Sequence, residues 1–281
     1  MDRDSIRSLL RKAEVLLGHA GSTPRLDAEV LLAHALGRTR SVLHAWPEHQ
    51  PTLEQAGIYE ELLVRRRRGE PVAYLIGKRE FWSIELAVTS ETLIPRPETE
   101  LLVELALARI PADRPVDVAD LGTGSGAIAL ALATERPRAR IVATDMNPAS
   151  LEVARENARR LEISNVTFQL DDWNASTIRL PFDIIVCNPP YIALDDPHLN
   201  QGDLRFEPRA ALVAGRDGLD ALRVVIAQAP SRLRPGGWLA LEHGCNQQRR
   251  VISLLAEHGY ESVEGHRDIA GLARACCARK P

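Results

Sequence analysis

The chain carries the stretch DIIVCNPPYI at residues 183–192. Its first half is apolar and rich in β-branched residues, which is typical of a buried parallel strand. The two prolines that follow have no amide donors, so strand pairing must stop at Asn188. In an open α/β sheet, ligands bind at the carboxyl ends of the strands. The stretch therefore predicts a parallel sheet with a ligand cleft at this corner.

Four residues of this corner, Asn188, Pro189, Pro190 and Tyr191, carry its predicted chemistry. The amide oxygen of Asn188 and the carbonyl oxygens of Asn188 and Pro189 are acceptors, and the prolines keep them stiffly aimed. Converging acceptors suit a substrate that bears an NH2 group, and the ring of Tyr191 can cover that planar group. We interpret these four residues as catalytic and substrate-binding, with catalysis by positioning rather than by an acid or base. The alternative is a rigid loop without chemistry.

Length and composition limit the classes of function. The chain has 281 residues and a formal net charge of -3, so it is long enough for one large and one smaller domain but carries no overall basic field for a nucleic acid duplex. The four cysteines show neither metal-ligand nor disulfide spacing. The first residues do not resemble a signal peptide, and no apolar run approaches the roughly 20 residues of a membrane span. We therefore expect a cytoplasmic protein without a metal site.

The part before the sheet divides into two regions. Residues 1–70 predict short helices that form an N-terminal substrate-recognition domain, and residues 71–95 contain β-prone pieces, including 72–76, that form a β-hairpin linker. The run Arg65–Arg68 is interpreted as a solvated last helical turn, with a contact patch for an RNA-containing or acidic partner as the alternative. Arg96, between two prolines, either faces the cofactor cleft or pairs with Glu98 or Glu100.

From Val116 onward, strands alternate with helices, which indicates βαβ units and a parallel sheet. We predict an α/β fold, a Rossmann-like domain at residues 96–281 with a mostly parallel seven-stranded sheet. The expected strands are 116–121, 141–145, 166–170, 183–188, 236–243, 261–266 and 272–278. A helix is expected to run to about Leu233.

A glycine-rich turn follows the first of these strands, with Gly122, Thr123, Gly124, Ser125 and Gly126 as candidate cofactor ligands. The pattern misses the dinucleotide spacing G-x-G-x-x-G by one residue. Asp145, at the end of the next strand, is placed to bind ribose hydroxyls, and Trp173, after the third strand, is placed to pack on adenine. The alternatives are a tight turn without a ligand and a core tryptophan. Together with the Asn188 corner, these features suggest S-adenosylmethionine as the cofactor.

The motif DLGTGSG at residues 120–126 together with NPPY at 188–191 resembles the signature of amino-methyltransferases. Four further motifs narrow the resemblance to the peptide chain release factor glutamine methyltransferase family, known as PrmC or HemK: REFW at 79–82, IPRPETE at 94–100, RFEP at 205–208 and LEHG at 241–244.

The resemblance implies a protein-(glutamine-N5) methyltransferase with a class I fold. Its substrate is the glutamine of the Gly-Gly-Gln motif in bacterial class 1 peptide chain release factors, and S-adenosyl-L-methionine becomes S-adenosyl-L-homocysteine. By the same resemblance, residues 122–126, Asp145, Trp173 and Asn188 contact the cofactor, residues 188–191 hold the glutamine, and the helical domain grips the release factor.

Three other functions share some of these features. A DNA or RNA adenine-N6 methyltransferase has the same corner but needs a basic cleft and a target-recognition insert. A glutamine methyltransferase acting on a ribosomal protein is closer, and the helical N-terminal domain favours release factors over it. A non-catalytic binding factor has little use for both Asp145 and Asn188. We expect a monomer that contacts neither nucleic acid nor membrane.

Overall fold

The fold is described from a computed structural model, which covers residues 4–18, 23–173 and 181–281. The chain divides into two compact units, Met1–Lys78 with Pro197–Phe206, and Arg79–Asp196 with Glu207–Pro281. The boundaries of these units differ from the expected ones at residues 70 and 95. Most of the segment predicted as a linker belongs to the second unit. A short later segment groups with the first.

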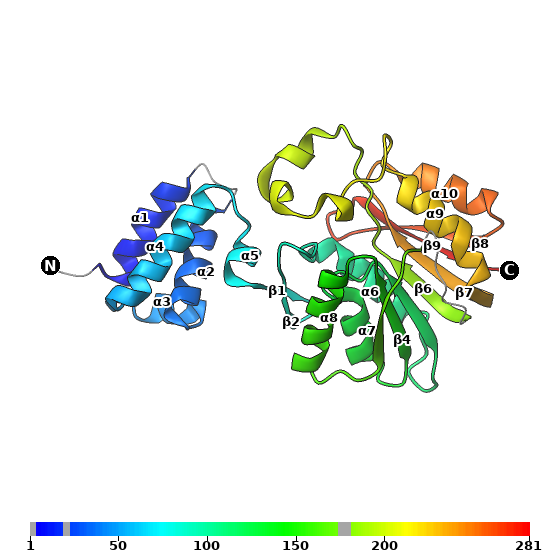
Figure 1. The fold of residues 1–281 in the computed structure, drawn as a ribbon, viewed down its shortest axis with the longest axis horizontal. Helices are drawn as coiled ribbons and strands as arrows, with labels where there is room; N and C mark the ends of the chain where they lie inside the picture. The colour runs from blue at the N-terminus through cyan, green and yellow to red at the C-terminus, as the bar shows by residue number, and fades with distance from the viewer. Residues whose placement is uncertain (1–3, 19–22, 174–180) are drawn as a thin grey trace. The chain divides into compact units, whose positions relative to one another are not determined.

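Up to Gly77, the regular elements among the described residues of the first unit are all helices (Figure 1). Its elements are α1 (Ile6–Leu17), α2 (Pro24–Leu36), α3 (Arg40–Ala45), α4 (Leu53–Arg67), α5 (Val72–Ile76) and the 3-10 helices η2 (Pro197–Asn200) and η3 (Gly202–Phe206). Thr52 and Gln55 form a capping box at the start of α4. The helices enclose one apolar core around residues such as Leu10, Leu31 and Tyr59. None of the described helices of the chain is long and apolar enough to cross a membrane.

Residues 72–76 form the helix α5, so the prediction of a strand there was wrong. The amides of Tyr74 and Leu75 bond back to the carbonyl of Pro71, and Gly77 ends the turn with φ +72°. A proline before and a left-handed glycine after favour one helical turn over a strand. Leu75 packs into the helical core, and this burial overrides the β-propensity of the segment.

The arginine run is not a uniformly solvated turn. Arg66 is 6% exposed and its Nε donates to Asp27 Oδ2 at 2.8 Å, while its Nη1 lies 3.0 Å from Asp203 Oδ1. Arg65 pairs with Glu70. Arg66 therefore joins α4 to α2 and η3 inside the first unit, and neither sequence interpretation described its role.

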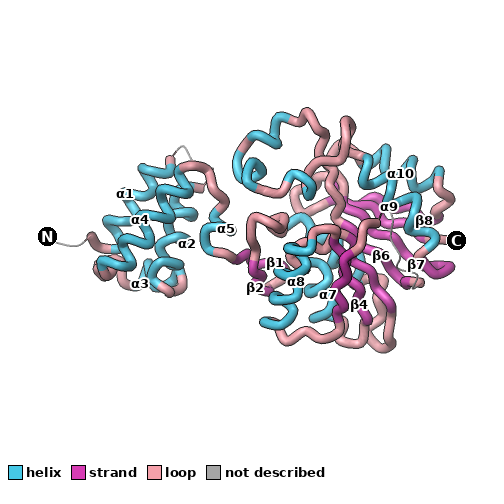
Figure 2. Tube along the Cα trace, in the orientation of Figure 1, coloured by secondary structure: helices cyan, strands magenta, loops and turns pink. Residues whose placement is uncertain are grey.

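The second unit is built on a seven-stranded sheet in the order β5-β4-β3-β6-β7-β9-β8. Figure 2 shows strands in magenta and the helices around them in cyan. The strands are β3 (Asp117–Leu121), β4 (Arg140–Asp145), β5 (Val166–Leu170), β6 (Phe182–Cys187), β7 (Leu233–Glu242), β8 (Glu261–Arg267) and β9 (Ala273–Arg279). The first five are parallel, and β9 runs antiparallel to both β7 and β8. A separate hairpin pairs β1 (Lys78–Phe81) with β2 (Ile84–Ala87). This confirms the predicted fold class.

Helices cover both faces of this sheet. They are η1 (Pro97–Thr99), α6 (Glu100–Leu107), α7 (Ala127–Glu135), α8 (Pro148–Arg160), η4 (Arg209–Ala211), α9 (Asp220–Gln228), η5 (Ala229–Ser231) and α10 (Gln248–Glu257). Alternate strand residues pack on α6 and α7 on one face and on α9 and α10 on the other. The expected helix to Leu233 was too long, because Pro230 ends regular helix pairing and Leu233 already begins β7.

Candidate active site

The glycine-rich turn after β3 has the backbone that its sequence predicts. Gly122, Gly124 and Gly126 have φ values of +73°, +57° and +88°, in the region that glycine enters most easily. The Gly124 amide donates to Asp145 Oδ2 at 2.9 Å, and the Thr123 hydroxyl donates to Asp120 Oδ2 at 2.6 Å. The carboxylates of Asp120 on β3 and Asp145 on β4, two neighbouring strands, therefore hold the turn in place.

One buried carboxyl group, Asp120, and one half-buried carboxyl group, Asp145, give this region its electrostatic character. Burial raises the pKa of Asp120 to about 7, against the opposing hydrogen bonds from Thr123 and from the Ala129 amide. Burial also raises the pKa of Asp145, although both its oxygens accept from backbone amides, Oδ2 from Gly124 and Oδ1 from Asn147. A cation bound beside these groups stabilises their charged forms.

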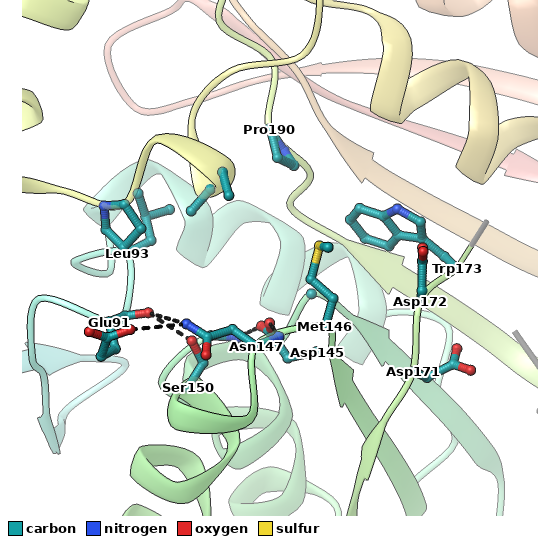
Figure 3. Close-up of a pocket in the computed structure, with 15 residues that line it drawn as sticks. Glu91, Leu93, Asp145, Met146, Asn147, Ser150, Asp171, Asp172, Trp173 and Pro190 are labelled. Carbon is teal, nitrogen blue, oxygen red and sulfur yellow. Dashed lines mark hydrogen bonds between the residues drawn. The ribbon is translucent and has the colours of Figure 1, made fainter. Parts of the chain in front are cut away.

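A pocket opens at this edge of the sheet. Figure 3 shows Trp173 and Asp172 on one side of it, Glu91, Asn147 and Ser150 on the other, and Asp145 with Met146 between them. The remaining lining residues are Leu93, Gly122, Gly124, Asp171, Pro190, Pro208, Ala210 and Ala211.

The charged side chains among the described residues of this lining are all acidic. Its lining includes Glu91, Asp145, Asp171 and Asp172, and no Lys, Arg or His side chain from the described residues. A pyrophosphate needs donors and positive charge, so this lining disfavours a dinucleotide. Carboxylates beside an indole suit a ligand with ribose hydroxyls, an adenine ring and a positive charge.

The Asn188 corner begins directly after β6. Asn188 is half-buried and its Nδ2 donates to Thr99 Oγ1 at 3.1 Å, which leaves Oδ1 as the acceptor of the amide. The Tyr191 hydroxyl donates to Glu242 Oε1 at 3.1 Å, and its carbonyl accepts from Gln247 Nε2 at 3.0 Å. Both ends of Tyr191 are thus fixed, so its ring is a rigid surface beside the corner.

The structure brings four predicted site residues, Gly122, Gly124, Asp145 and Trp173, into the pocket lining together with Pro190. The predicted cofactor ligands outside that lining are Thr123, Ser125, Gly126 and Asn188, and Pro189 and Tyr191 of the corner are also outside it. Thr123, Ser125 and Gly126 are buried. Trp173 lies 3.2 Å from the position that a Cβ on Gly122 would occupy, so the indole closes directly over the glycine turn.

Sequence reasoning missed one wall of the pocket. Asn147 caps α8 by accepting from the Ala149 amide at 2.9 Å, and its Nδ2 reaches Glu91. The Ser150 hydroxyl donates to the Glu91 carbonyl at 2.7 Å. An Asn-Pro helix start two residues after Asp145, the predicted ribose-binding residue, was the available signal. Glu91 lies in the segment predicted as a linker, and no sequence signal marked it as a pocket residue.

Arg96 pairs with Glu207 rather than with a glutamate of its own motif. The Glu207 side chain is fully buried and its Oε2 also accepts from the Ile94 amide at 3.0 Å. Glu207 of the RFEP motif thus contacts the IPRPETE motif at two points, and the next residue, Pro208, lines the pocket. The alternative that paired Arg96 with Glu98 or Glu100 was therefore wrong, and Arg96 is not among the residues that line the pocket.

Comparisons with known proteins agree with this architecture. Residues 8–77 match the family model described as PrmC N-terminal domain, and residues 113–268 match the one described as methyltransferase domain. The chain is 46% identical to a release factor glutamine methyltransferase of Coxiella burnetii over 98% of this chain and 99% of that protein. It is 48% identical to a protein of the same name from Escherichia coli over 92% and 94%, respectively. A crystal structure of a ribosomal protein L11 methylase from Lactobacillus delbrueckii subsp. bulgaricus is similar at a TM-score of 0.50 and 25% identity, over 67% of this chain and 81% of that one.

Proposed function

Because the chain belongs to the release factor glutamine methyltransferase family, we propose that it methylates the side-chain amide nitrogen, N5, of the glutamine in the Gly-Gly-Gln motif of bacterial class 1 peptide chain release factors. The observation that carries this proposal is the meeting of an acidic, indole-lined pocket and an amide-binding corner at one edge of the sheet.

The pocket residues fit S-adenosyl-L-methionine. In this assignment, Asp145 accepts from the ribose hydroxyls with the lone pairs that Gly124 and Asn147 leave free, and Trp173 packs on the adenine. The carboxylates around the pocket complement the positive charge of the sulfonium. The cofactor supplies an electrophilic methyl group, and S-adenosyl-L-homocysteine is the product.

The Asn188 corner holds the substrate amide. Oδ1 of Asn188 and the carbonyl of Pro189 accept from the two hydrogens of the glutamine NH2, and Tyr191 covers the amide plane. A primary amide is a poor nucleophile, so the gain comes from orientation and from acceptors that stabilise positive charge developing on nitrogen. The glycines beside the glutamine allow the motif to enter without side-chain clashes.

The rest of the chain receives proposed roles that follow from the family. We assign release factor recognition to the helical N-terminal domain at residues 1–70, with 71–95 as a linker and 96–281 as the methyltransferase domain. The protein acts as a cytoplasmic monomer, and neither nucleic acid nor membrane is a partner in this proposal.

The test is mass spectrometry of a purified class 1 release factor after incubation with the protein and S-adenosylmethionine. We expect a gain of one methyl group on the peptide that contains Gly-Gly-Gln, and no gain on DNA or on ribosomal proteins. The variant Asn188→Ala should still bind the cofactor but methylate at least 100-fold more slowly, in the range measured for removal of one positioning group. Methylation of DNA in place of the release factor would refute the proposal.

A further inference from the structure

Gln247 holds three backbone groups of the loops beside the Asn188 corner with a single carboxamide. Its Nε2 donates to the Tyr191 carbonyl at 3.0 Å and to the Gly218 carbonyl at 3.2 Å, and its Oε1 accepts from the Gly244 amide at 2.8 Å. The residue is 8% exposed. A carboxamide has two N–H donors, and both are used here. The amide therefore fits in one orientation, because the reverse would set its oxygen against two carbonyls.

The backbone of the corner needs anchors from outside. The two prolines have no amide proton, so neither can donate a hydrogen bond to the edge of the sheet. The segment that follows is paired: the Ile192 amide donates to the Leu212 carbonyl at 2.9 Å, and the Ile192 carbonyl accepts from the Ala214 amide at 2.9 Å. Tyr191 lies between the prolines and this pairing, and its carbonyl accepts from Gln247. This hydrogen bond anchors the corner where its aromatic ring joins the chain.

Gln247 itself has a rigid base. It is the residue directly before α10, and its carbonyl accepts from the amide of Val251, which is buried in the core of the sheet domain. A few residues earlier, the His243 amide donates to the Arg274 carbonyl on β9 at 2.9 Å. The loop that carries Gln247 is thus tied to a strand and a helix. Groups on rigid elements hold a geometry more exactly than groups on free loops.

The backbone of Gly218 comes close to the same carbonyl. Gly218 has a φ of +72°, and a Cβ there would collide with the Tyr191 carbonyl oxygen and lie 2.8 Å from Gln247 Nε2. Only glycine allows this approach without displacing one of the two. The approach brings two carbonyls within reach of one NH2 group, so the Tyr191 peptide is enclosed on the side away from the substrate.

We propose that Gln247 is a positioning residue that fixes the Tyr191 backbone and thereby holds the Tyr191 ring over the substrate amide. This inference rests on the proposed function, in which Tyr191 covers the amide plane. Glu242 binds the hydroxyl at the far end of the ring, and Gln247 fixes the end that joins the chain. The described lining of the cofactor pocket includes neither Tyr191 nor Gln247. Loss of Gln247 should therefore slow methyl transfer without weakening cofactor binding.

The test compares Gln247→Met and Gln247→Glu in single-turnover methylation of a release factor with the enzyme in excess, so that slow variants remain measurable. Methionine removes all three hydrogen bonds, whereas glutamate keeps an acceptor for the Gly244 amide and loses the donors to Tyr191 and Gly218. We expect the rate to fall about 10- to 100-fold in both variants. Calorimetry should give a cofactor Kd within twofold of the wild type, and its stoichiometry normalises the rates to folded molecules.

Matched controls come from the next residue. Gln248 is half-buried on α10, and Gln248→Met and Gln248→Glu should both stay within about twofold of the wild-type rate. If Gln247→Met does not bind the cofactor, the glutamate variant decides. A Gln247→Glu variant close to the wild-type rate would overturn the inference, because the Gly244 contact would then account for the role of this residue. Wild-type turnover in Gln247→Met would overturn it as well.

A double-mutant cycle with Tyr191→Ala separates positioning of the ring from general support of the loops. The alanine variant keeps the carbonyl at 191 but has no ring to place, so adding Gln247→Met should lower its rate less than about twofold further. The full loss of the single variant in that background would refute an action through Tyr191. If the wild-type protein itself left the release factor unmethylated, the proposed function would fail instead.

Discussion

The contact between Gly122 and Trp173 allows a quantitative test of the cofactor site. Gly122 and Gly124 both have positive φ, at +73° and +57°, and both line the pocket. A Cβ on Gly122 would meet two atoms of the Trp173 ring at 3.2 and 3.3 Å, whereas a Cβ on Gly124 would meet nothing within 4 Å. The substitutions Gly122→Ala and Gly124→Ala therefore share their backbone strain and differ in their effect on the indole.

The expected loss of unfolding free energy follows from the backbone strain, and the expected loss of cofactor affinity follows from the displacement of the indole. Alanine in a left-handed conformation costs about 1–2 kcal/mol, and this cost should appear as a similar loss of unfolding free energy in both variants. Stacking of an aromatic side chain on a base is worth about 1–3 kcal/mol. Gly122→Ala must displace the indole by a few tenths of an ångström, so we expect it to lose about 1 kcal/mol of cofactor affinity more than Gly124→Ala, or about fivefold in Kd.

Calorimetric titration with S-adenosylmethionine measures this difference in a double-mutant cycle with Trp173→Leu. In the leucine background the collision is absent, so the extra cost of Gly122→Ala should disappear, while the cost of Gly124→Ala should not change. Any direct clash between the new methyl group and the cofactor cancels in this comparison. Equal coupling of both glycines to Trp173, or unchanged affinity in Trp173→Leu alone, would refute the placement of the adenine beside the indole.

Three further predictions concern charged groups. Asp145→Ala removes the acceptor assigned to the ribose and the one that holds the glycine turn, so the cofactor Kd measured by calorimetry should rise at least about tenfold; an unchanged Kd would contradict the assignment. Arg66→Met leaves Asp27 buried without its partner and should cost about 3–5 kcal/mol in urea unfolding, whereas Arg65→Met, at a partly exposed pair, should cost about 1 kcal/mol or less. Burial raises the pKa of Glu242 from 4.5 to about 7. Between these two pH values the folded chain retains a proton that the unfolded chain has lost. The contribution of this proton to the unfolding free energy therefore disappears as the pH rises through 7. The unfolding free energy of Glu242→Gln relative to the wild type should therefore rise between about pH 5 and pH 8 in urea titrations, and a constant difference would exclude a raised pKa for this group.

The sheet and the two motifs at its edge were predictable because their signals are local. An apolar run that ends in two prolines marks a strand terminus, and alternate glycines after another strand mark a tight turn. The expected positions of Asp145, Trp173 and Asn188 at the ends of β4, β5 and β6 agree with the structure. In each case, strand periodicity and backbone chemistry act within a few residues.

Partners that come from distant segments could not be predicted in the same way. The pairing of Arg96 with Glu207 joins residues 111 positions apart, and Arg66 reaches Asp203 across 137 positions. Nothing in the local sequence of an arginine distinguishes a solvated side chain from a buried ion pair. The helix at 72–76 failed for a related reason, because the fate of a five-residue β-prone segment depends on the core against which it packs.

Strand register accounts for how the cofactor pocket and the substrate corner come to lie together. Leu121 pairs with Cys187 and Cys187 pairs with Leu241, so the residues that follow these positions, Gly122, Asn188 and Glu242, leave three adjacent strands at the same level. Adjacent strands lie about 5 Å apart, so one strand spacing separates the glycine turn from Asn188 and another separates Asn188 from Glu242. The distance between the glycine turn of the proposed cofactor pocket and the Asn188 corner is therefore set by backbone pairing in the core of the sheet. Substitutions on the loops can change affinity, but only changes at these strand ends should alter the alignment on which positioning catalysis depends.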